Sequence, residues 1–165
     1  MATAKDVVRL QLDNAQKLME MFTADLSDEE YFKPAAADTN HAAWIVGHIA
    51  CSEDSLVSLI TGGAKRIPDG THALFGGEST CLPDASKYPS RKELDDMLLT
   101  ACAHTLEALQ TFDEGKWENP APEGLPQEVF PSLGAVWGLL ATHSWWHIGQ
   151  LTTCRKVLGK KPQLT

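Results

Sequence analysis

The sequence predicts an all-α protein with a single domain. Four segments repeat their apolar residues with the period of a helix, and no segment sustains the alternation of apolar and polar residues that marks a half-buried strand. The length of 165 residues suits one domain, which buries roughly two-thirds of the surface of the unfolded chain. Residues 1–165 are therefore expected to form one unit.

The first two predicted helices cover residues 4–26 and 41–60. Asn14 interrupts an otherwise apolar stripe of the first helix. Pro34 and the polar run after it separate the two helices, and Gly62 marks the end of the second. The inner face of the second helix includes Trp44, Ile45, His48, Ile49 and Leu56.

The other two predicted helices cover residues 90–112 and 132–158. Ser90 and Glu93 form a capping box, in which each side chain accepts a hydrogen bond from a free backbone amide of the first turn. Gly159, followed by two lysines and Pro162, marks the end of the last helix.

The connections over residues 61–89 and 113–131 are long, rich in Gly and Pro, and predicted to contain no regular element. Long ordered loops over a helical scaffold are often functional lids. A crossover between helices that are not simple antiparallel neighbours also requires such a length. The sequence favours neither explanation over the other.

Charge, the N-terminal sequence and the cysteines limit the expected partners and location of the protein. The net charge of −8, with no cluster of Lys or Arg, argues against a nucleic-acid partner. The N-terminus lacks the apolar run of a secretory signal or membrane anchor, so a cytoplasmic protein is expected. Its four cysteines are widely separated without a CxxC pair, which predicts reduced thiols rather than disulfides or a thiolate zinc site.

Three histidines form a candidate metal site. His143 and His147 are four residues apart, so a helix directs both imidazoles to the same side. The pair alone is also compatible with ordinary core packing. His48 lies on the inner face of the second helix, beside Gly47, which would permit close approach of another helix. A third inward histidine favours the metal interpretation.

Three imidazoles suit zinc, nickel or ferrous iron and leave at least one coordination position open. Because imidazole ligands are neutral, the charge of the ion is uncompensated and favours an anion such as hydroxide, a carboxylate or a thiolate. Asn14 and Gln150 are candidate hydrogen-bond partners for the ligand rings, although either could instead cap a loop.

The remaining histidines fit the site less well. His41 lies about 10 Å along the helix from His48, too far to share one ion, and is placed at the mouth of the bundle. His104 is expected to be a partly buried polar residue, and His72 to be exposed. Trp145 and Trp146 are interpreted as packing residues of the core or of an interface.

Three stretches carry a family resemblance: NHAAWIVGHIA at residues 40–50, FGGESTCLPDASKYPSRKEL at residues 75–94, and HSWWHIGQL at residues 143–151. The first and third match GH and HxxxHxGQ patterns, and the middle stretch resembles a YPSxxEL entry into the third helix. Together they make the chain similar to the DinB/YfiT-like superfamily, whose members are regarded as metalloenzymes.

The resemblance implies a four-helix bundle in up-down-down-up order, which accounts for at least one long crossover loop. It implies that His48, His143 and His147 bind nickel, zinc or iron, and that the protein is a homodimer. Relatives include S-transferases that use bacillithiol or mycothiol, a mycothiol-dependent isomerase, and the bundle domain of iron-dependent sulfoxide synthases.

The leading hypothesis is a transferase in which a divalent metal activates a low-molecular-weight thiol for attack on an electrophilic small molecule. A second hypothesis is a hydrolase in which Glu53 or Asp54 acts as the base for a metal-bound hydroxide. A third is a metal- or ligand-binding stress protein without turnover.

Overall fold

The computed structural model describes residues 2–164, and the described chain contains helices but no strand. The all-α prediction is therefore confirmed. The four long helices are α1 (Ala4–Thr23), α3 (Ala42–Thr61), α5 (Arg91–Thr111) and α6 (Leu133–Val157). The short elements are α2 (Asp28–Tyr31), α4 (Asp69–Phe75), η1 (Ala85–Lys87) and η2 (Glu114–Lys116).

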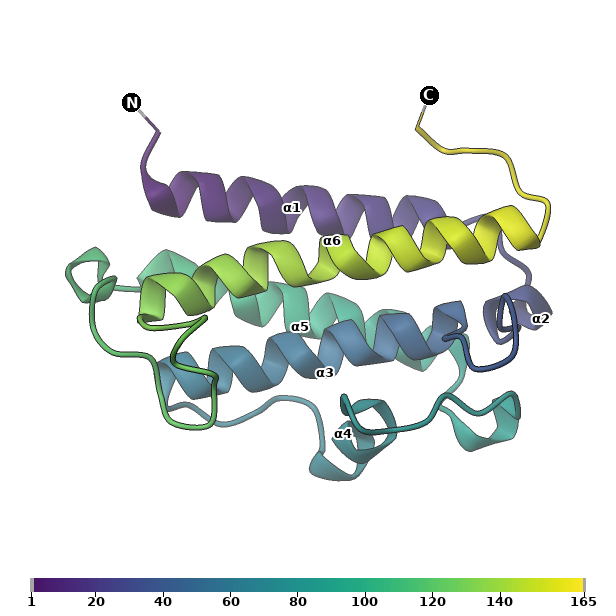
Figure 1. The fold of residues 1–165 in the computed structure, drawn as a ribbon, viewed down its shortest axis with the longest axis horizontal. Coiled ribbons are helices and arrows are strands. Elements are labelled where there is room, and N and C mark those ends of the chain that lie inside the picture. Colours follow the sequence, from purple (N-terminus) through teal and green to yellow (C-terminus); the bar gives the residue numbers. More distant parts are fainter. Residues whose placement is uncertain (1, 165) are drawn as a thin grey trace.

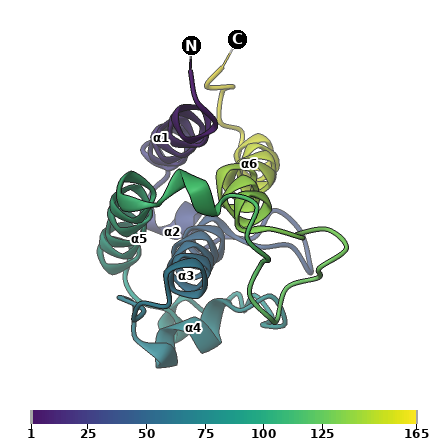
Figure 2. The same cartoon turned by 90° about the vertical axis from the view of Figure 1, so that its left-hand side faces the viewer.

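The four long helices lie side by side, with α1 and α6 running in one direction and α3 and α5 in the other (Figure 1). Each packs against two others: α3 against α5 and α6, and α1 against the same two. In the end-on view, α1 lies across from α3, and α5 across from α6 (Figure 2). The parallel neighbours α3 and α5 need a crossover, which residues 62–90 supply.

Both long connections contain short elements that the sequence pattern does not predict. Residues 62–90 include α4 and η1, and residues 112–132 include η2. These elements are too short to show a helical period, so the expectation of no regular structure is wrong there. Element α4 packs against α3, which makes this crossover part of the wall around the centre of α3.

The ends of the long helices follow from local hydrogen bonds. The predicted capping box of α5 is present, with Ser90 and Glu93 each accepting from the other's backbone amide. Helix α1 ends at Thr23, earlier than the predicted residue 26. The reason is a second capping box at Ser27 and Glu30, which starts the separate helix α2.

Helix α3 is the most buried element of the structure. Every residue from position 41 to position 51 is buried, and the core around it includes Met19, Tyr31, Ile45, Ile49, Phe75, Leu94 and Leu151. Within residues 2–164, α3 is also the one helix long and apolar enough to cross a membrane, but 67% of its apolar window is buried inside the protein. Its hydrophobicity therefore matches its place in the core.

Candidate metal centre

The structure brings together the three histidines that the sequence singles out. His143 and His147 lie one turn apart on α6, and His48 faces them from α3. The Nε2 atom of His143 lies 3.4 Å from Nε2 of His48 and 3.2 Å from Nε2 of His147. His48 and His147 are buried, each with 9% of its surface exposed. The rings therefore meet through the same nitrogen in a nearly closed site.

Hydrogen bonds fix which nitrogen faces the centre. His48 Nδ1 donates to the carbonyl oxygen of Phe75 at 2.7 Å, and His147 Nδ1 lies 3.1 Å from Gln150 Oε1, which accepts in the same way. Both Nδ1 atoms therefore carry the ring proton. Neutral imidazole has one such proton, so the Nε2 atoms of His48 and His147 present lone pairs to the centre.

His143 completes this arrangement. Its Nδ1 atom is buried and has no hydrogen-bond partner among the described residues. If His143 Nε2 carried a proton, it could donate a hydrogen bond to His48 Nε2 or to His147 Nε2, but not to both. A bound cation, in contrast, would accept a lone pair from all three Nε2 atoms. Tetrahedral bonds of 2.0–2.1 Å to nitrogen separate the ligand atoms by about 3.3–3.4 Å. The two separations from His143, 3.2 and 3.4 Å, match this value, and the three ligand atoms all lie within 4.8 Å of one another.

The environment keeps the three rings neutral. Burial lowers the pKa of His48, and the hydrogen bond to Phe75 only partly opposes this. Burial, with the charges of His147 and His48, lowers the pKa of His143 to about 4. Burial and the charge of His48 also lower the pKa of His147. Neutral rings are the form that binds a metal, so protons compete weakly at neutral pH.

The position of His48 depends on Gly47 and α4. A Cβ atom at Gly47 would lie 2.4 Å from the Phe75 ring, so only glycine allows Phe75 to reach this surface. The sequence associates Gly47 with a neighbouring helix, and the segment that approaches is the short α4. Trp44 stacks on the His48 ring at 4.7 Å between centroids, and its Nε1 donates to Ser79 Oγ. These contacts hold the imidazole in a single orientation.

Of the two candidate partners for the ligand rings, the structure brings Gln150 to the site. It contacts His147, whereas Asn14 on α1 makes none of the hydrogen bonds described for the three rings. The carbonyl oxygen of Phe75 serves His48 instead. No sequence signal identifies that atom, because it is a backbone group in a crossover segment.

The sequence matches the DinB superfamily over residues 11–151. The chain belongs to the DinB superfamily. A solved structure, described as that of a conserved protein of a locus from Enterococcus faecalis, is similar with a TM-score of 0.76 and 18% identity. The similarity covers 97% of this chain and 100% of that chain, and at such identity it supports the fold alone. No curated protein matches the chain.

An open groove of about 440 Å³ in this DinB superfamily member has His143 in its wall. The polar and ionisable side chains along it are Cys51, Ser52, Ser55, Lys65, His72 and His143, with no carboxylate among its lining residues. The groove therefore reaches one of the three histidines of the candidate centre.

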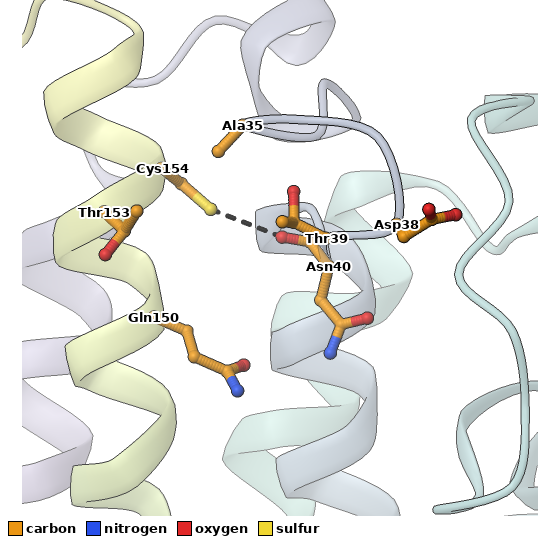
Figure 3. A pocket seen from close by; sticks show the side chains of 7 residues that line it. All are labelled: Ala35, Asp38, Thr39, Asn40, Gln150, Thr153 and Cys154. Carbon is orange, nitrogen blue, oxygen red and sulfur yellow. Dashed lines mark hydrogen bonds between the residues drawn. The ribbon is translucent and has the colours of Figure 1, made fainter.

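A second pocket of about 250 Å³ contains Gln150 in its wall (Figure 3). The amide groups of Gln150 and Asn40 extend into it, and Cys154 Sγ donates to the Asn40 backbone oxygen at 3.3 Å. Because Gln150 also contacts His147, this pocket adjoins the centre. The candidate centre is thus bordered by a groove and a pocket.

The other histidines lie outside the three-histidine cluster. His41 is fully buried and caps α3 by accepting a hydrogen bond from the Trp44 amide, while its Nε2 contacts the Leu82 carbonyl. His104 is buried and contacts Asp54, as expected of a polar core residue. The expectation that His72 is exposed is wrong, because α4 places its ring over Asp54 with 13% of the side chain exposed.

The two carboxylates considered as bases do not line the groove. Glu53 is buried and accepts hydrogen bonds from Thr105 and Ser144. Asp54 is fully buried and bound by backbone amides. Trp146 is not a core residue, since 64% of its surface is exposed in the single chain.

Proposed function

We propose that this protein is a divalent-metal-dependent enzyme whose ion is held by His48, His143 and His147. The observation that carries the proposal is the convergence of three Nε2 atoms, two of which present lone pairs because their Nδ1 protons are engaged elsewhere. Membership of the DinB superfamily is compatible with metal binding. The groove beside His143 is where a substrate would approach the open coordination position.

The reaction that we favour is transfer of a low-molecular-weight thiol to an electrophilic small molecule. When bound, the metal would lower the pKa of the thiol and stabilise the thiolate. The protein offers no reactive thiol of its own. Burial raises the pKa of Cys51, in the groove wall, to about 12, and it raises the pKa values of the other three cysteines as well. The nucleophile would therefore come from solution.

Metal-dependent hydrolysis is the less favoured alternative. It needs a base beside the attacking water, and both carboxylates considered for that role are engaged away from the groove. A protein that binds metal without turnover is a further alternative.

The proposal is tested by loading the protein with zinc, nickel or ferrous iron and assaying thiols, including cysteine and glutathione, against a panel of electrophiles. Conjugation that depends on metal and is lost in His147→Ala supports the transferase. Hydrolysis of esters or amides without thiol supports the hydrolase, and metal binding without turnover supports the binding protein. The metal-free wild type is the matched control.

The proposed helix order and oligomeric state rest on the resemblance to the superfamily. We propose that the four long helices form an up-down-down-up bundle, a view supported by their directions and pairwise packing. We also propose a cytoplasmic homodimer, which sedimentation analysis would test. The free state of all four cysteines is compatible with a reducing compartment.

A further inference from the structure

Two side-chain amides extend into the second pocket of about 250 Å³, called the Gln150 pocket (Figure 3). Gln150 belongs to α6, and Asn40 belongs to the segment that precedes α3. The volume is slightly below the roughly 300–1,000 Å³ of sites for drug-sized ligands. The Gln150 pocket therefore suits a small ligand or one group of a larger ligand.

The Asn40 carboxamide is available to a ligand, whereas other polar side chains of the wall are engaged. The hydroxyls of Thr39 and Thr153 and the thiol of Cys154 each donate to a backbone carbonyl oxygen. No hydrogen bond joins the Asn40 carboxamide to another residue of the wall (Figure 3). This carboxamide offers both an acceptor and two donors.

The contact with His147 fixes the orientation of the Gln150 carboxamide. Gln150 Oε1 accepts from His147 Nδ1 at 3.1 Å, which leaves the Nε2 amino group as the free end of the side chain. The opposite orientation would set two donors, Gln150 Nε2 and His147 Nδ1, against each other. The Gln150 pocket therefore contains a donor of fixed orientation together with the Asn40 carboxamide.

The charge of the wall indicates an uncharged ligand group. Asp38 contributes a carboxylate, and none of the lining residues is Lys, Arg or His, so an anion would be repelled. An ammonium group has no acceptor to offer to Gln150 Nε2. An amide meets both conditions, because its oxygen accepts from Gln150 Nε2 and its N–H donates to Asn40 Oδ1.

Helix geometry places the Gln150 pocket on the same side of α6 as the groove. Gln150 follows His143 by seven residues, so the two side chains point in directions about 20° apart and lie about 10 Å apart along the axis. Trp146 lies between them, with 64% of its surface exposed and its ring centroid 6.2 Å from that of His143. The His147 ring separates Gln150 from the Nε2 atoms of the centre.

We propose that the Gln150 pocket binds an uncharged amide group of the substrate whose thiol binds at the metal centre. The role in substrate binding rests on the proposed function, whereas amide binding itself does not require the metal. The hydrogen bonds of the ligand rings involve Phe75, Gln150 and the rings themselves. Replacing Asn40 therefore removes no partner of the metal site, which makes Asn40 the residue that isolates specificity.

The first test uses metal-free protein and acetamide. ¹H–¹⁵N correlation spectra report the side-chain amino groups of Asn40 and Gln150, which Asn40→Leu and Gln150→Leu assign. We expect saturable shifts of both groups with acetamide and none with acetate. The dissociation constant should be about 3- to 10-fold higher in Asn40→Leu, the effect of one lost hydrogen bond.

Thr153→Ala is the matched control and should bind acetamide as the wild type does, because the Thr153 hydroxyl is bonded within its own helix. Equal shifts with acetate, absence of saturable shifts with acetamide, or an unchanged affinity in Asn40→Leu would overturn the site.

The second test connects the Gln150 pocket with the metal centre. Mercaptoethanol and N-acetylcysteamine, a small thiol that carries an amide, are titrated into cobalt-loaded protein, and thiolate-to-cobalt absorption reports binding. We expect the wild type and Thr153→Ala to bind N-acetylcysteamine about 3- to 10-fold more tightly than mercaptoethanol. Asn40→Leu should lose most of this preference.

The outcomes separate the two proposals. Thiolate absorption with both thiols, without a preference in the wild type, overturns the role of the Gln150 pocket in substrate binding and leaves the metal–thiol function intact. Absence of thiolate absorption with either thiol overturns the thiol function, while the acetamide spectra still decide whether the pocket binds an amide.

Discussion

At the scale of single residues, the candidate metal centre depends on atoms that fix the ring protons of His147 and His48. Gln150 Oε1 accepts from His147 Nδ1, and the Phe75 carbonyl oxygen accepts from His48 Nδ1. Such partners orient the rings and raise their basicity toward the metal. Gln150 is the partner that can be altered through its own side chain.

Replacing Gln150 with leucine should weaken metal binding about 10- to 100-fold, because His147 loses the acceptor that holds its tautomer. Competition with a chromogenic chelator measures the affinity. Thr153→Ala is the matched control, since Thr153 lines the same pocket without contacting a ligand ring. Wild-type affinity in Gln150→Leu would show that the contact does not support the centre.

Glu53 is a second residue whose effect can be isolated. Burial raises its pKa from 4.5 to about 7, despite hydrogen bonds from Thr105, Ser144 and Cys102. Between these values the folded state holds a proton that the unfolded state has lost, so this carboxyl makes the folded state less stable as the pH rises through that window. At a pH above this window, the folded state contains the ionised carboxylate of Glu53 in its core.

Glu53→Gln should therefore increase the free energy of unfolding at pH 8 by about 1–3 kcal/mol and should have little effect at pH 4.5. Urea denaturation of both proteins across this pH range measures the difference. A variant that loses stability at pH 8 would mean that the ionised carboxylate stabilises the fold.

At the scale of elements, the short helix α4 of the crossover packs beside the candidate metal centre. Phe75, the last residue of α4, lies on Gly47 of α3 and presents its carbonyl to His48. His72, one turn earlier on α4, contacts Asp54 and Ser55 of α3. The crossover thus both joins two parallel helices and positions polar groups around the groove.

Gly47→Ala should destabilise the protein by about 1–3 kcal/mol and weaken metal binding, because the new methyl group displaces Phe75 and the acceptor of His48. Gly138→Ala on α6, where nothing lies within 4 Å, should instead be neutral or stabilise by up to about 1 kcal/mol. Thermal denaturation and chelator competition check both variants. Equal behaviour of the two would contradict the role of the Phe75 contact.

The sequence predicts the long helices and the three histidines because each has a local signature. Apolar periodicity identifies α3 and α6, Ser90 and Glu93 identify the start of α5, and four-residue spacing pairs His143 with His147. The role of α4 depends on a tertiary contact between residues 28 positions apart, Gly47 and Phe75, which no periodicity encodes. For the same reason, the polar composition of the crossover wrongly predicts an exposed His72.

At the scale of the whole molecule, the candidate centre joins two helices that are far apart in sequence. His48 belongs to α3, and the other two histidines belong to α6. A metal at this position binds the folded chain and not the unfolded one, since only folding brings the three rings together. Metal binding should consequently stabilise the entire fold.

Zinc at about 100 times its dissociation constant should add about 2.7 kcal/mol to the free energy of unfolding. Thermal denaturation of metal-free and zinc-loaded protein measures the effect as a rise in melting temperature. His48→Ala should show no such rise. An equal increase in that variant would place the stabilising ion elsewhere.

The central claim is that three histidines bind one divalent ion. Elemental analysis of the wild type and of a variant with the same helical content tests this claim most directly. Wild-type protein purified without chelator should contain one divalent ion per chain, and His48→Ala, with an unchanged circular dichroism spectrum, should contain almost none. A wild type that takes up no stoichiometric metal, or a His48→Ala variant that retains it, would contradict the assignment of the centre.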